Sequence, residues 1–137
     1  MPQVLLIVAL LVIGIAANEW NPRFLDRNEV DKMKWLAYEA EDVINRECRG
    51  RESLLVPTRN IISVAEQHVQ NNVNRYTMVA EFQRSSHCKC GGRHGHGTCG
   101  TDPSKPVEKF QIESTVRNAF AADAKNREFS IDSVRRL

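Results

Sequence analysis

The residues with the clearest capacity for chemistry lie in one glycine-rich stretch, residues 85–106. Thiolate and imidazole side chains are ligands that zinc and copper prefer, and four of them would close a structural zinc site. Their order, Cys-x-Cys-x3-His-x-His-x2-Cys, is not that of a common zinc module. The sequence therefore predicts no metal site and no cofactor, and His94 and His96 are kept as the residues that would ligate a metal if one binds. The cysteines and histidines of the stretch are His87, Cys88, Cys90, His94, His96 and Cys99.

A disulfide is the other use for these cysteines. A bridge between Cys88 and Cys99 would close a loop of about a dozen residues, which stabilises a fold by roughly 3 kcal/mol in the chain-entropy treatment. The histidines would then stand in solvent among the glycines. We predict this bridge.

Catalysis by one of these thiols would need a base held beside a thiolate. His87 precedes Cys88 directly, but no third group is in place to orient it on a glycine-rich loop. Neither Gly-x-Ser-x-Gly nor His-Glu-x-x-His occurs, and the carboxylates of residues 39–42 fall on the exposed side of an expected helix. The sequence therefore predicts that the protein is not an enzyme.

The chain begins with an apolar, uncharged run over residues 4–17. At about 14 residues this run is shorter than the roughly 20 needed to span a bilayer, and it ends in small residues at Ala17. It predicts a signal peptide over residues 1–17, a secreted chain over residues 18–137, and no membrane association after cleavage. An exported protein meets an oxidising compartment, which favours disulfides. The net charge of +2 gives no reason to expect nucleic-acid binding.

One apolar stripe predicts a long amphipathic helix over residues 29–47, with Asn28 as its N-cap and Gly50 beyond its end. Such a helix hides only one face, so it must pack on another apolar surface. The stripe consists of Val30, Met33, Leu36, Ala37, Ala40, Val43 and Ile44.

Strand patterns supply that surface. Residues 53–69 are β-prone around Pro57, residues 70–72 read as a turn, and the next strand alternates apolar and polar positions. Further strands are expected near residues 107–116 and 128–134. We therefore predict an α+β domain over residues 18–137, in which one long helix packs on a curved antiparallel sheet of four to five strands, with residues 85–106 as a loop. The inward face of the alternating strand is Tyr76, Met78, Ala80 and Phe82.

Several stretches, taken in order, resemble the secreted, disulfide-containing cystatins, which inhibit cysteine proteases. "IISVAEQHV" at residues 61–69 resembles the strand that leads into their Gln-x-Val-x-Gly hairpin. Tyr76 and Glu81 fall where the next strand often has "NY…E", and "FQI" at residues 110–112 fits a later strand. "SSHCK" and "GTCG" resemble the two halves of the family's first disulfide, at Cys88 and Cys99.

The resemblance implies a monomeric inhibitor of papain-like cysteine proteases. In the family, an N-terminal segment and two hairpins form a wedge that enters the protease cleft. Here the first hairpin is residues 67–73, its turn reads about two residues longer than the family's, and Asn71 stands where the family has Gly. "TVRNAF" at residues 115–120 stands where the second hairpin has Pro-Trp, with Phe120 as the nearest apolar residue. The implied protease-binding residues are Gln67, His68, Val69, Gln70 and Asn71.

The family's second disulfide has no counterpart here at either of its positions. Cys48 and Cys90 are present instead. They could form a second pair if their Cα atoms come within about 7 Å, and free thiols or an intermolecular bridge stay open. Two other functions also stay open: a secreted binding protein of the same fold that does not inhibit, and metal binding through the cysteine and histidine loop.

Overall fold

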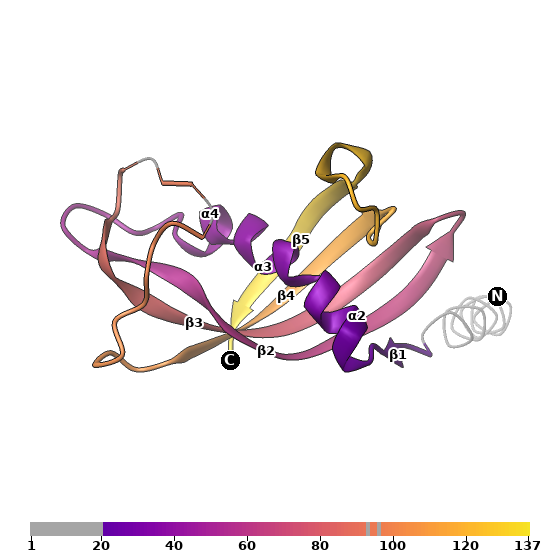
Figure 1. Cartoon of the computed structure of the whole chain (residues 1–137), viewed down its shortest axis with the longest axis horizontal. Helices are drawn as coiled ribbons and strands as arrows, with labels where there is room; N and C mark the ends of the chain where they lie inside the picture. The colour runs from indigo at the N-terminus through magenta and orange to yellow at the C-terminus, as the bar shows by residue number, and fades with distance from the viewer. Residues whose placement is uncertain (1–20, 93, 96) are drawn as a thin grey trace, which may run out of the picture.

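The computed structural model describes residues 21–92, 94–95 and 97–137, so the predicted signal peptide lies outside the described residues (Figure 1). Within this part of the chain no helix is long and apolar enough to cross a membrane. The strands are β1 (Arg23–Phe24), β2 (Ser53–Gln70), β3 (Val73–Lys89), β4 (Glu108–Arg117) and β5 (Glu128–Arg136). The helices are α2 (Arg27–Lys32), α3 (Lys34–Glu39) and α4 (Glu41–Ile44), with a 3-10 turn η1 (Ala124–Asn126).

The five strands form one antiparallel sheet in chain order, β1-β2-β3-β4-β5. β3 lies at its centre, and the helical segments lie across one face of the sheet (Figure 1). The predicted inward face of β3 is confirmed, because its four residues are at most 1% exposed and belong to the core. These residues are Tyr76, Met78, Ala80 and Phe82.

The prediction of one long helix over residues 29–47 is wrong, and the predicted fold class is wrong with it. The protein is mostly antiparallel sheet, and its helical stretch is divided into α2, α3 and α4, which have 6, 6 and 4 residues. The first break is at Met33, with φ −99° and ψ 5°. The second is at Ala40, with φ −79° and ψ −12°.

The spacing of the buried side chains explains the first break. Val30, Met33 and Leu36 follow one another at intervals of three, and all are buried under 5% exposure. An α-helix has 3.6 residues per turn, so such positions drift around its axis, whereas a 3-10 turn stacks them. The backbone takes the tighter form here: the Met33 N–H donates to Val30 O at 2.9 Å and the Leu36 N–H donates to Met33 O at 3.0 Å. Tightening keeps all three side chains against the sheet.

α2 starts two residues before the predicted helix, because its N-cap is Asp26 rather than Asn28. The Asp26 carboxylate accepts from the Glu29 N–H at 2.9 Å, and the Glu29 carboxylate accepts from the Asp26 N–H at 3.1 Å. This reciprocal pair is a capping box, which satisfies donors that a helix start leaves free. It fixes Glu29 at the point where the chain leaves β1.

Trp35 of α3 anchors the start of β5. Its ring meets Phe129 edge to face, with the ring centroids 5.2 Å apart. The Arg127 guanidinium lies over the same indole, 4.5 Å from the centroid. Aromatic and cation–π contacts of this kind are each worth about 0.5–1.5 kcal/mol. They hold the connection between β4 and β5 in place.

The two cysteine pairs lie together at one end of the sheet, at disulfide distance and in the pairing that the sequence suggested. Cys48 and Cys90 join the exit of the helical stretch to the end of β3, with Cα atoms 5.7 Å apart. Cys88 and Cys99 close the loop after β3, with Cα atoms 5.8 Å apart. β3 runs on to Lys89, so residues 85–89 are strand although the glycine content around them suggested a loop.

Replacing Leu36 by Ala tests how much the broken helical stretch contributes. Leu36 is fully buried in the core, so its truncation should lower the free energy of unfolding by about 2–5 kcal/mol. Urea denaturation followed by circular dichroism measures the loss. Lys34→Ala, on the exposed side of the same segment, is the matched control and should change stability by less than about 0.5 kcal/mol. Equal effects of the two variants would contradict the described packing.

Candidate functional site

The turn between β2 and β3 is tight. Gln70 pairs with Val73, so only Asn71 and Asn72 lie between the strands, and the longer turn suggested by the sequence does not form. Asn72 has φ 56°, a left-handed conformation that Asn tolerates better than most residues. The pairing of β2 with β3 shifts register between His68 and Gln70, just before the turn.

A second turn lies directly beside the first. β4 ends at Arg117, which pairs with Val73, and Asn118 follows with the same φ of 56°. The Asn118 N–H donates to Asn72 O at 3.1 Å, so the two turns are joined through their backbones. The Asn118 amide also donates to Asn126 O at 3.3 Å, which closes the connection to β5.

Three exposed apolar side chains stand at this end of the sheet. Val69 is 44% exposed just before the first turn, Phe120 is 41% exposed just after the second, and Phe24 in β1 is 69% exposed. We call the surface formed by residues 23–24, 67–72 and 118–121 the turn edge. In Figure 1 it is the end of the sheet at the right, away from the two disulfides. Exposed apolar side chains at neighbouring turns are candidates for contact with another protein.

A hollow of about 330 Å³ lies beside Phe120 on the turn edge. Asn72, Asn74 and Tyr76 line one side of it, and residues 118–121 line the other. The hollow gives a partner side chain a recess between the two turns.

Arg23 ties β1 to the rest of the molecule. Its guanidinium donates to both Glu29 carboxylate oxygens, at 3.0 and 2.9 Å, and to Glu66 at 3.0 Å. These hydrogen bonds raise the pKa of Arg23 above its usual value. The bond from Arg23, with the backbone bond at Asp26 as the next cause, lowers the pKa of Glu29 to about 2. The ion pairs of Arg23 with Glu29 and Glu66 therefore hold β1 against β2 at neutral pH.

The same network continues into the hairpin. The Tyr76 hydroxyl donates to Glu66 at 2.8 Å and accepts from the Asn74 amide at 3.2 Å. The Asn74 amide oxygen lies 3.2 Å from His68 Nδ1. Burial raises the pKa of Tyr76 above its usual value, and the bond to Glu66 adds to this while the bond from Asn74 opposes it, so the hydroxyl stays a donor. A continuous polar chain thus runs from β1 to the residues before the turn.

The structure places the five predicted protease-binding residues together on β2 and the first turn. His68, Val69, Gln70 and Asn71 are exposed. Gln67 is half-buried and lines a hollow of about 250 Å³ with residues of β3, β4 and β5, including Arg75 and Asp132. Their role in binding stays a prediction.

Arg23, Glu66 and Asn118 were missed by the sequence reading. One signal was present, because Asp26 and Glu29 show the D-x-x-E spacing of a capping box and so mark the helix start beside β1. The contact of Asn118 with Asn72 depends on the register of β4 against β3, which no local pattern reveals.

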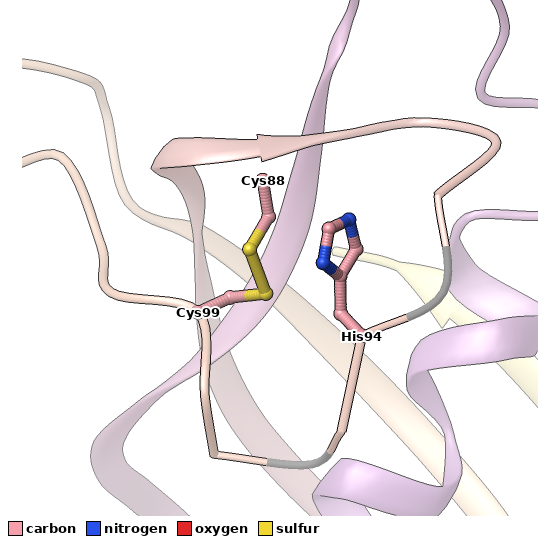
Figure 2. A group of neighbouring side chains, drawn as sticks. All are labelled: Cys88, His94 and Cys99. Atoms are coloured by element: carbon pink, nitrogen blue, oxygen red, sulfur yellow. A yellow bond between two sulfur atoms is a disulfide. The ribbon is translucent and has the colours of Figure 1, made fainter.

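The cysteine and histidine loop lies at the other end of the sheet. Cys88, His94 and Cys99 place their potential ligand atoms within 4.8 Å of one another (Figure 2). A second group, Cys48, Glu52 and Cys90, does the same nearby. His96 lies outside the described residues.

Comparison with known proteins does not identify a relative of this chain. No protein-family model matches it, and no curated protein matches it at a significant level.

Acidification should release β1 from the sheet. The pKa of Glu29 is lowered from 4.5 to about 2 in the folded protein, so its stabilising ion pair is present above pH 4.5 and is lost as the pH falls towards 2. The Leu25 N–H, directly after β1, donates to Val64 O at 2.9 Å, so its protection factor, the intrinsic exchange rate at each pH divided by the rate measured by NMR, should fall as the pH falls through this window. Glu29→Gln keeps a capping group but removes the charge, so its Leu25 protection factor should be low at every pH in the window. Asp31→Asn, on the same helix, is the control and should behave as the wild type.

Proposed function

We propose that the protein is a secreted inhibitor of papain-type cysteine proteases, and that the turn edge enters the protease cleft. The observation that carries the proposal is the hydrogen bond from the Asn118 N–H to Asn72 O, because it joins the two turns into one edge. The resemblance of residues 61–69 to the strand that leads into the first cystatin hairpin supports the same assignment. The apolar segment at residues 4–17 and the two cysteine pairs support secretion.

Binding through the turn edge would use its apolar tips and its rigidity. Val69 and Phe120 offer the area that a protease cleft would desolvate. The polar chain from Arg23 through Glu66 to Tyr76 fixes β1 and the hairpin before any partner arrives. Such preorganisation lowers the entropy that association costs. Phe120 would supply apolar contact where cystatins use Trp.

Replacing Val69 by Asp should weaken inhibition of papain, since a charge would replace an apolar contact at the centre of the turn edge. The inhibition constant should rise by about 30-fold, which corresponds to about 2 kcal/mol for one central contact. Steady-state titration of papain activity with the oxidised protein measures it. Adding Gln67→Ala should weaken the inhibition further.

Ile62→Asp is the matched control for Val69→Asp. Ile62 also lies in β2 and is also 44% exposed, but it stands away from the turn. Its inhibition constant should equal that of the wild type. If both variants inhibited papain equally poorly, the cause would be a general effect of a new charge on β2. The turn edge would then not be the binding surface.

Replacing Phe120 by Ala should raise the inhibition constant about tenfold, because the second turn would lose its apolar side chain. Val107→Ala is the control, since Val107 is similarly exposed at 47% but lies in the connection before β4, at the other end of the sheet. The same papain titration reports both. An unchanged constant for Phe120→Ala would mean that the second turn stands clear of the protease.

A secreted binding protein that does not inhibit is the second candidate. The sequence observation that favours it is the absence of both the turn Gly and the Pro-Trp pair of the family. If micromolar oxidised protein leaves papain and a panel of related proteases fully active, the inhibitor proposal fails and this candidate replaces it.

A further inference from the structure

His94 lies beside the Cys88–Cys99 disulfide, in the loop that follows β3 (Figure 2). The potential ligand atoms of the three residues are all within 4.8 Å of one another. Cys88 is buried, Cys99 is partly exposed and His94 is exposed. Two sulfur atoms and one imidazole nitrogen at such separations are a donor set that suits zinc.

The imidazole of His94 is oriented as a metal-binding histidine would be. Its Nε2 lies 3.3 Å from Lys89 O, so the proton belongs on Nε2 as the donor to that carbonyl. Nδ1 then keeps its lone pair. Histidines that ligate metals generally donate their other nitrogen to a carbonyl or carboxylate in this way. Figure 2 shows one ring nitrogen on the side that faces the sulfur atoms.

Gly92 leaves the space that this orientation needs. A Cβ atom at position 92 would lie 2.6 Å from His94 Nε2, which is too close for any two such atoms. The ring would therefore have to move from its present position if residue 92 carried a side chain. The backbone of Gly92 is not in the left-handed region, so the constraint there is steric rather than conformational.

We propose that Cys88, Cys99 and His94 bind a zinc ion when the Cys88–Cys99 disulfide is reduced. A thiol of the glutathione class would attack the accessible Cys99 sulfur, the S–S bond would break, and Cys88 would leave as a thiolate. A second thiol would then release Cys99 and form the oxidised thiol disulfide, so that two electrons pass from the two thiols to the cysteines. The two protons of the attacking thiols pass to the cysteine sulfurs or to solvent, and any still on sulfur leave to water when Zn²⁺ takes the two thiolates and Nδ1 of His94, with the fourth position open to water.

The second cysteine group is the competing site. Cys48 and Cys90 lie near Glu52, whose carboxylate oxygen is a harder donor than an imidazole. The loop around His94 also has glycines on both sides, at Gly92 and Gly95, which let the ligands adjust to the ion. The zinc site is therefore assigned to the loop, at the end of the sheet opposite the turn edge, and it does not depend on protease inhibition.

Metal titration of the full secreted chain, residues 18–137, tests the proposal. The chain is reduced with a thiol, the thiol is removed under argon, and Zn²⁺ or Co²⁺ is added against a chromogenic chelator. We expect one equivalent to bind to the reduced protein and none to the oxidised protein. Co²⁺ should give the thiolate charge-transfer bands and the intense visible bands of a tetrahedral site.

Gly92→Ala and Gly95→Ala form a matched pair for this experiment. The first displaces His94, whereas a Cβ at position 95 only touches Thr98 Cγ2 at 3.4 Å. Gly92→Ala and His94→Ala should weaken zinc binding at least about tenfold, and Gly95→Ala and His87→Ala should not. Glu52→Gln should also leave binding unchanged.

Three results would overturn the proposal. The first is a reduced protein that binds neither metal. The second is equal binding by Gly92→Ala and Gly95→Ala, which would also be the result if reduction unfolds the chain and the thiols bind zinc without a preformed site. The third is a loss of binding in Glu52→Gln but not in His94→Ala, which would move the metal to the second cysteine group.

Discussion

The burial of one face of β3 is the constraint on which the rest of the structure depends. Tyr76, Met78, Ala80 and Phe82 alternate along the strand, and each is at most 1% exposed. Because side chains alternate with a period of two, a slip of one residue would turn all four outward. The pairing of β3 with β4 is therefore held in one register, whereas β2 follows β3 with local register shifts. That register brings Asn72 and Asn118 together, so the position of the turn edge is a consequence of the core.

The helical stretch changes its backbone geometry to fit the sheet. Its buried side chains recur at intervals of three over Val30, Met33 and Leu36, and the backbone tightens at Met33 to keep them in the core against the sheet. Tyr76 links the core to the surface. Its buried hydroxyl needs a hydrogen-bond partner and donates to Glu66, and Glu66 accepts from Arg23 of β1. Core packing and the shape of the turn edge are thus coupled through one tyrosine.

Strands were predictable here where helix continuity was not. The alternation of apolar and polar residues in β3 fits only an extended strand, and it shows which side chains face the core and which face away from it. The apolar stripe of residues 30–44 contains intervals of both three and four, which suit a continuous helix and a broken one alike, and only contact with the sheet decides between them. The order of residues 67–71 predicts a protease-binding hairpin, and that role stays a prediction. The contact of Asn118 with Asn72 could not be predicted, because the two residues meet through strand pairing across 46 positions of chain.

The Cys48–Cys90 bond has a consequence for how the molecule would withstand a protease. It links residues 42 positions apart and encloses nearly all of β2 and β3, with the first turn near the middle of the ring. If an enzyme nicks the chain at Asn71 or Asn72, the two new ends remain in one covalent molecule, each still paired along its strand. The fragments do not diffuse apart, so the cut edge stays assembled on the sheet.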